Sequence, residues 1–136
     1  MFKFDDSSKF IKVLDLKVPW AHTYADMRPG KTDLDRRENF RKAASEVMRS
    51  KPLNPLWWAF RISVGKSGRL LDVDNIAKTI IDSFSESQLV RDKSEWPHLA
   101  LYRDDTFDEV RILQVIGAPS TLADSTYIEV FACIQE

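Results

Sequence analysis

The amino-acid sequence predicts a single α/β domain, residues 1–136, with a mixed sheet of about five strands packed against two main helices. Two observations predict this class. Segments in which apolar and polar residues alternate are interspersed with segments that carry apolar residues at every third or fourth position. The chain of 136 residues is long enough to bury a core of its own and has the length of one ordinary domain.

The predicted strands rest on alternation and on enrichment in β-branched and aromatic residues. The first covers residues 10–20 and is terminated by Pro19, with Val13, Leu14 and Leu16 among its apolar positions. The others are predicted over residues 56–64, 99–102, 110–116 and 126–134.

Two helices are predicted between these strands. The first covers residues 33–50, with Thr32 or Asp33 as the cap. Its apolar stripe comprises Leu34, Phe40, Ala44, Val47 and Met48. The second covers residues 75–86, with Asp74 as the cap and with Ile76, Ile80, Ile81 and Phe84 facing the core. Residues 85–98 are predicted to form a polar linker or a lid, pinned by Trp96.

The composition, 43% hydrophobic and 30% charged, is that of a soluble globular protein. The N-terminus shows no secretory pattern, and the single cysteine, Cys133, lies in an apolar segment, so we expect a buried thiol in a reducing cytosol. With one cysteine and two loop histidines, His22 and His98, we do not expect a thiolate or imidazole zinc site. Any bound metal would be held by oxygen, which indicates magnesium, manganese or calcium.

The formal net charge of −1 conceals a segregation of charge along the chain. Residues 28–70 carry a net charge of +7 and residues 71–136 a net charge of −8. A basic segment of this kind is compatible with binding to nucleic-acid phosphates. Its candidate contacts are Arg36, Arg37 and Arg41 (with Lys42) off the apolar stripe of the first helix, and Lys66 and Arg69 in a glycine-containing loop. The alternative is that the helical arginines form an ordinary solvated face.

An acidic pattern follows this loop. Asp72 and Asp74 lie two residues apart where an extended segment passes into a helix, Lys78 and Asp82 continue at four-residue spacing, and Asp104–Asp105 forms a second acidic pair. One interpretation is structural: Asp74 caps the helix, Asp72 is solvated, and Lys78 and Asp82 form a surface ion pair. The other is a magnesium site built from several carboxylates. The pattern alone leaves both open.

The order Asp72-x-Asp74-Asn75-x-x-Lys78-x-x-x-Asp82, then Asp104–Asp105 leading into a strand, resembles the RusA family of Holliday junction resolvases (crossover junction endodeoxyribonucleases). An early strand running into Pro19–Trp20 is also similar to that family.

The resemblance implies a RusA-like fold and a homodimeric, Mg²⁺-dependent endonuclease, in which Mn²⁺ may substitute, that cuts four-way DNA junctions in recombination and repair. It implies a cytoplasmic protein of a prokaryote or phage. Asp72, Asp74 and Asp105 match the metal-binding aspartates of the family and Lys78 its essential lysine. Asp104 matches a further acidic position at the metal, and Asn75 and Asp82 match supporting positions.

Two features depart from the family pattern. The stretch between Asp82 and Asp104 is longer, and the strand after Asp105 lacks a lysine near its end, where Gln114 is the nearest polar residue. Two alternatives to the junction resolvase therefore remain. One is a non-catalytic DNA-binding protein on the same fold, and the other is a metal-dependent nuclease for other branched or single-stranded nucleic acid.

Overall fold

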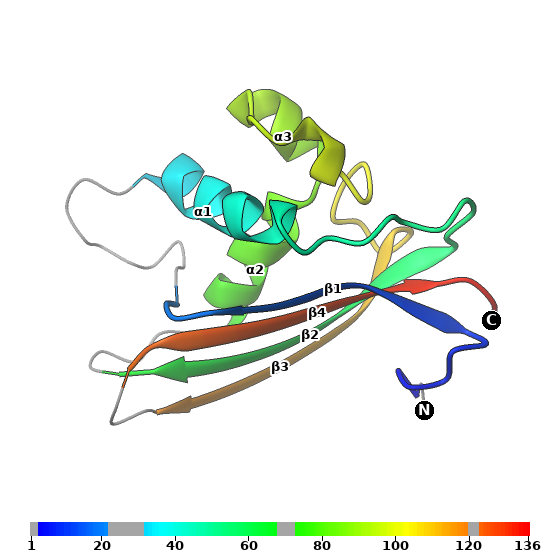
Figure 1. Cartoon of the computed structure of the whole chain (residues 1–136), viewed down its shortest axis with the longest axis horizontal. Coiled ribbons are helices and arrows are strands. Elements are labelled where there is room, and N and C mark those ends of the chain that lie inside the picture. Colours follow the sequence, from blue (N-terminus) through cyan, green and yellow to red (C-terminus); the bar gives the residue numbers. More distant parts are fainter. Residues whose placement is uncertain (1–2, 22–31, 68–72, 120–122) are drawn as a thin grey trace.

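The computed structural model describes residues 3–21, 32–67, 73–119 and 123–136, and of residues 73–75 the backbone only (Figure 1). The elements follow one another in the order β1 (Phe10–Val18), α1 (Asp33–Ser45), β2 (Trp57–Lys66), α2 (Val73–Ser83), α3 (Glu86–Asp92), the 3-10 helix η1 (Pro97–Leu99), β3 (Val110–Pro119) and β4 (Ser125–Cys133). The predicted single α/β domain is present.

The sheet has four strands in the described part of the chain, in the order β1-β4-β2-β3, rather than the five predicted. β4 runs antiparallel to both β1 and β2, and β2 runs parallel to β3, so the sheet is mixed as expected. The strand predicted over residues 99–102 is wrong. Pro97 begins a 3-10 turn there, and only an isolated bridge between Tyr102 and Ser85 remains of the predicted pairing.

All three α-helices lie on one face of the sheet (Figure 1). The core between them is built from the strand residues that face the helices, such as Leu14, Phe60 and Val130. The core positions predicted for the second helix are confirmed, since all four side chains are buried: Ile76, Ile80 and Ile81 in α2 and Phe84 just after it. The alternating pattern of β1, β2 and β4 and the helical pattern of α2 thus bury one common surface.

The first helix is shorter than predicted, because it ends at Ser45 rather than at residue 50. Thr32 is its cap: its hydroxyl accepts from the Asp35 N–H, and the Asp35 carboxylate accepts from the Thr32 N–H. Phe40 and Ala44 are buried as predicted, whereas Leu34 is 39% exposed.

Residues 85–98 are not the polar linker that the sequence predicts. Ser85 caps α3, whose C-terminal turn is closed by Lys93 in the left-handed region at φ 52°. Trp96 packs against the main core, as its expected pinning role requires. The segment therefore forms a third helix that extends the helical layer.

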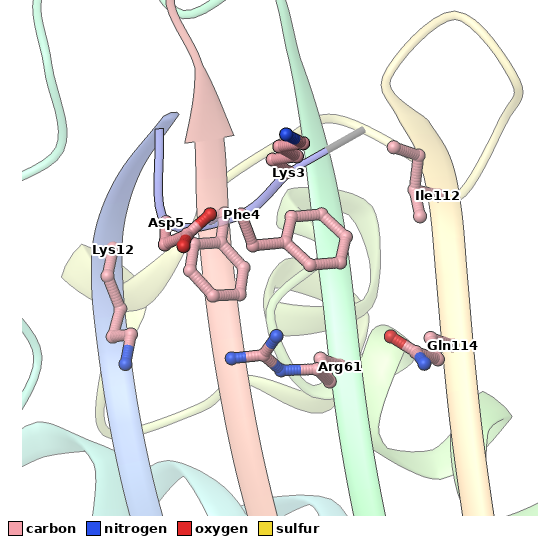
Figure 2. Close-up of a pocket in the computed structure, with 8 residues that line it drawn as sticks. Lys3, Phe4, Asp5, Lys12, Arg61, Ile112 and Gln114 are labelled. Atoms are coloured by element: carbon pink, nitrogen blue, oxygen red, sulfur yellow. The ribbon is translucent and has the colours of Figure 1, made fainter. Parts of the chain in front are cut away.

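The opposite face of the sheet carries a smaller apolar cluster, comprising Phe10, Trp57, Ala59, Phe131 and Cys133. The burial predicted for Cys133 is confirmed. Phe4 stacks on Phe131 and helps to line an open hollow of about 1000 Å³, into which Lys12 and Arg61 also project (Figure 2). No helix in the described residues is long and apolar enough to cross a bilayer.

Candidate active site

Lys78 lies on the exposed side of α2, between two aspartates from different parts of the chain. Its Nζ lies 3.6 Å from Asp82 Oδ2 and 3.8 Å from Asp105 Oδ2. The Lys78 side chain is 60% exposed, and these distances are longer than a hydrogen bond, so the ammonium remains accessible. The fold thus brings together three residues of the predicted pattern: Lys78, Asp82 and Asp105.

Helical periodicity explains the contact between Lys78 and Asp82, because residues four apart share a helix face. Asp105 reaches Lys78 because the chain before it is bound to the start of α3. The Glu86 N–H donates to the Tyr102 carbonyl at 2.8 Å, and the Ser87 N–H donates to the Arg103 carbonyl at 3.1 Å. The N-terminus of α3 therefore positions the segment that presents Asp105.

The two members of the later acidic pair have different partners. Asp105 faces Lys78, while Asp104 accepts a hydrogen bond from the Ser87 hydroxyl at 2.5 Å. The Asp104 N–H also donates to the Glu109 carboxylate at 3.0 Å. Asp104 is therefore engaged with α3 and with its own loop, and only Asp105 reaches the lysine.

Tyr102 is a buried residue beside this cluster that the sequence pattern did not indicate. Its hydroxyl donates to the carbonyl of Ile81 and so joins the last turn of α2 to the chain leading to Asp105. Burial, followed by the nearby carboxylates of Asp82 and Asp105, raises the pKa of Tyr102 well above its ordinary value. The phenol therefore stays neutral and remains a hydrogen-bond donor.

The first part of the predicted motif is described only in part. Asp72 lies outside the described residues, and so do the side chains of Asp74 and Asn75. The backbone of α2 begins at Val73, which places Asp74 in the first turn rather than at the predicted cap. Among the side chains that are described, no group of three or more aspartate, glutamate, histidine or cysteine residues is arranged to hold a metal ion. Asp82 and Asp105 alone would supply two oxygen-donor side chains.

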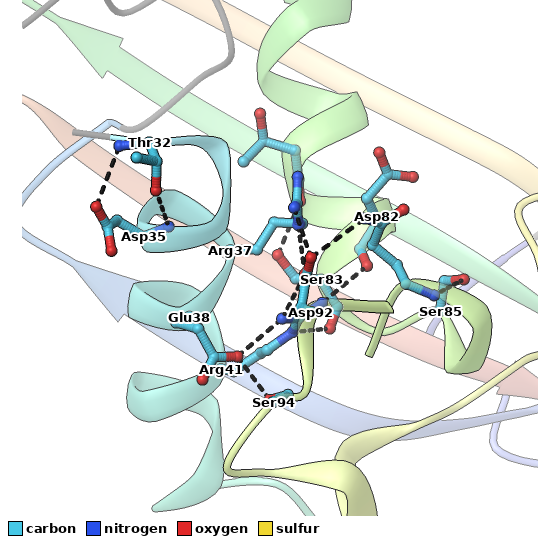
Figure 3. Close-up of polar contacts among 12 residues, drawn as sticks. Thr32, Asp35, Arg37, Glu38, Arg41, Asp82, Ser83, Ser85, Asp92 and Ser94 are labelled. Atoms are coloured by element: carbon cyan, nitrogen blue, oxygen red, sulfur yellow. Dashed lines mark hydrogen bonds and ion pairs between the residues drawn. The ribbon is translucent and has the colours of Figure 1, made fainter. Parts of the chain in front are cut away.

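The prediction that Arg36, Arg37 and Arg41 contact phosphates is wrong for this fold, because all three side chains are buried. Arg37 binds both oxygens of Asp92, with Nε at 2.7 Å and one Nη at 2.8 Å (Figure 3). Arg41 donates to Asp92 at 2.9 Å and to Glu38 at 2.8 Å. Arg36 forms an ion pair with Asp33 at 2.9 Å.

This arginine network has a structural role. The Arg41 Nε also donates to the Ser83 carbonyl at 2.7 Å, which satisfies an acceptor at the end of α2. Burial alone would raise the pKa of Asp92, but the hydrogen bonds from Arg37 and Arg41 hold it below its ordinary value. The ionised network therefore joins α1 to the ends of α2 and α3.

The basic loop after β2 is described only at its start. Lys66 Nζ lies 2.9 Å from Asp124, whose carboxylate also accepts from the Ser67 N–H and hydroxyl. Burial would raise the pKa of Asp124, yet Lys66 and Ser67 lower it to about 2. Lys66 is thus largely neutralised, and Arg69 lies outside the described residues.

Comparison of the chain with protein-family models, with curated proteins and with solved structures finds no significant match.

Proposed function

We propose that the protein is a magnesium-dependent, structure-selective DNA endonuclease that resolves four-way junctions by paired phosphodiester hydrolysis. One observation supports this proposal above the others: the Lys78 ammonium lies within 4 Å of the carboxylates of Asp82 and Asp105. These residues occupy three positions of the pattern shared with the RusA family. A surface ion-pair ladder on α2 alone would not include Asp105, which comes from another segment.

The donor chemistry fits a hard divalent cation. The described part of the site supplies carboxylate oxygens from Asp82 and Asp105, and magnesium prefers oxygen ligands. In this proposal Asp72, Asp74 and Asp105 hold the ion, with Asp104 beside them. The bound ion would supply an activated water and charge neutralisation at the phosphate.

Lys78 is the residue of this site whose role is best supported by its surroundings. Its ammonium is exposed and held near two carboxylates without a short hydrogen bond, so it can donate to a phosphate oxygen. Such a donor stabilises the negative charge that grows in the transition state of phosphodiester hydrolysis. Asp82 orients Lys78 from the next turn of the helix, and Tyr102 supports the segment that carries Asp105.

Cleavage of a synthetic four-way junction tests the proposal. The wild-type protein is incubated with the junction in Mg²⁺ and in EDTA, beside an Asp105→Asn variant and an Asp108→Asn control. Asp108 is an exposed aspartate of the same loop that makes no ion pair with the described residues. We expect paired nicks in Mg²⁺ from the wild type and the control, and a loss of roughly 100-fold or more in the Asp105 variant.

Other outcomes identify the alternatives. Tight junction binding without cleavage in any divalent metal would contradict the proposal and favour a non-catalytic DNA-binding protein. Cleavage of flaps or single strands, with intact junctions, would favour a nuclease of different selectivity. A Lys78→Ala variant that binds the junction normally but cuts about 100-fold more slowly would support the role given to the ammonium. Symmetric cutting further requires a homodimer, which sedimentation of the protein would test.

A further inference from the structure

A small hollow between the C-terminus of α1 and the 3-10 helix η1 is lined by cationic side chains. Its volume is about 230 Å³, and its polar lining comes from Arg49, Lys51, His98, Ser45 and Ser50. The remaining wall is apolar side chains and backbone, and no carboxylate of the described residues lines it. Two segments about fifty residues apart in the chain thus place basic groups around one concave site.

Arg49 and Lys51, the cations of this hollow, have no acidic partner among the described residues, in contrast to Arg61, Lys12 and Lys66. In the larger hollow on the open face, Arg61 and Lys12 both bind Glu129, at 2.8 Å each. Lys66 is paired with Asp124. By contrast, among the described residues Lys51 donates to the Ala100 carbonyl alone, at 3.3 Å, and Arg49 forms no ion pair. The charge of the hollow is therefore available to a ligand.

Two backbone carbonyls at the helix end beside the hollow already accept hydrogen bonds. The Ala44 carbonyl accepts from the Val47 and Met48 N–H groups, and the Lys42 carbonyl accepts from the Ser45 hydroxyl. Cations near a helix C-terminus stabilise the helix by interacting favourably with its dipole. This gives a structural explanation for the presence of Arg49 and Lys51 near the end of α1. That explanation does not account for the concave shape of the site or for the basic group that His98 of η1 adds to it.

We propose that this hollow binds phosphate groups, namely the backbone phosphates of the nucleic acid on which the protein acts. Guanidinium and ammonium groups with neighbouring hydroxyls are the donors that proteins use for phosphate oxygens. The identification of the phosphate as that of a nucleic acid rests on the proposed function. The presence of an anion site does not depend on it. It also supplies phosphate contacts in place of those lost to burial at Arg36, Arg37 and Arg41.

Residues 101–102 connect the hollow to the helix that carries Lys78. The Leu101 N–H, on the wall of the hollow, donates to the Phe84 carbonyl at 3.0 Å just after α2. The next residue, Tyr102, donates to Ile81 within α2. A phosphate bound in the hollow would therefore be held in a fixed relation to Lys78, which is on the same helix.

Junction binding in EDTA tests the proposal. Affinity is measured by fluorescence anisotropy at several salt concentrations for the wild type, for Arg49→Ala/Lys51→Ala, and for the control Lys42→Ala/Arg91→Ala. The control removes the same charge from exposed residues in the last turns of α1 and α3. We expect the hollow variant to bind roughly tenfold more weakly, with a salt slope lower by about two, and the control to change much less. Equal losses in both variants, or no loss in the first, would overturn the proposal.

A second measurement separates this proposal from the proposed function. The chain has two histidines, so the ring signals of His98 are readily assigned by NMR with a His98→Gln variant. Titration with inorganic phosphate should shift them in the wild type and not in Arg49→Ala/Lys51→Ala. If the wild type binds no DNA but phosphate shifts the His98 ring signals, the phosphate site is supported and the nuclease function is contradicted. If His98 does not shift and DNA binding is unaffected by the variant, the site does not exist.

Thermal unfolding of the same variants is the remaining control. A structural role at the helix end would lower the melting temperature of Arg49→Ala/Lys51→Ala while leaving DNA affinity at the level of the charge-matched control, and this result would also overturn the proposal. If the double variant does not fold, the single variants Arg49→Gln and Lys51→Gln replace it, with each expected to lower the salt slope by about one.

Discussion

Arg41 donates hydrogen bonds to three elements from a fully buried position. Its guanidinium binds Glu38 on its own helix, Asp92 at the end of α3, and the Ser83 carbonyl at the end of α2 (Figure 3). A planar group with five N–H donors can satisfy acceptors that diverge in this way, whereas an ammonium cannot do so from one position. Arg41 therefore has a structural role that lysine would not fill.

We expect Arg41→Lys and Arg41→Ala to destabilise the protein strongly. Removing the guanidinium leaves the buried Asp92 carboxylate with one cationic partner fewer, and breaking a buried ion pair costs about 3–5 kcal/mol. Urea unfolding measures the loss. The control is Lys42→Ala, an exposed neighbour, for which we expect a change within about 0.5 kcal/mol. Similar midpoints for the Arg41 and Lys42 variants would contradict this role.

The burial of Arg41 could not be predicted from its own helix. A residue off an apolar stripe is usually solvated, and this expectation placed Arg36, Arg37 and Arg41 on the surface. What buries Arg37 and Arg41 is a third helix whose Asp92 lies 55 and 51 residues further along the chain. Lys78 is the opposite case, because the four-residue spacing to Asp82 predicted a contact that the structure shows.

At the scale of elements, α3 was missed although its cap signal is present. Ser85 accepts from the Gln88 N–H and begins a helix of 7 residues, of which only Leu89 is buried. A helix this short has too few apolar positions to show periodicity, so the polar composition suggested a linker. The strand expected at residues 99–102 is absent because Leu101 donates to Phe84, just after α2, and Tyr102 donates to Ile81 within α2, rather than to a sheet neighbour.

We expect Ser85→Ala to loosen both α3 and the segment that carries Asp105. The Ser85 hydroxyl caps α3 and also donates to the Arg103 carbonyl at 3.1 Å. Loss of such a cap costs about 1 kcal/mol. Hydrogen exchange followed by mass spectrometry should show faster exchange in residues 86–92 and 101–109, with β1 and β4 unchanged. Ser94→Ala, which removes a hydroxyl bonded to Glu38, is the matched control and should leave residues 101–109 protected. Uniformly faster exchange would instead indicate global destabilisation.

For the whole molecule, the sheet and the helical layer are held by carboxylates whose pKa values lie below their ordinary range. On the open face, hydrogen bonds from Arg61, opposed by burial and assisted by Lys12, lower the pKa of Glu129 from 4.5 to about 2. The pKa of Asp124 is likewise about 2. A depressed pKa means that the ionised group stabilises the folded state above pH 4.5, and that this contribution is lost as the pH falls from 4.5 toward about 2.

We therefore expect Glu129→Gln to be less stable than the wild type at neutral pH, by an amount that shrinks as the pH falls. Denaturant unfolding at a series of pH values between neutrality and pH 2 gives the difference in free energy of unfolding. Below pH 4.5 the two curves should converge, because the wild-type carboxyl becomes protonated in the unfolded chain first and then in the folded one. A difference that stays constant with pH would show that the ionised carboxylate is not the source of the stability.

The position of β4 in the sheet governs how the chain can assemble. β4 lies between β1 and β2 yet follows both in the sequence, so Phe10 meets Cys133 and Trp57 meets the same residue from the other side. During synthesis, β2 can pair with β3 and pack against α2 and α3 before β4 is made. β1 remains without a neighbouring strand until β4 has been synthesised. Such non-local closure slows folding, and the waiting apolar strand is open to association with other chains. A fragment that stops before Ser125 would lack the strand that connects β1 to the rest of the sheet, and its recovery from cells would depend on chaperones.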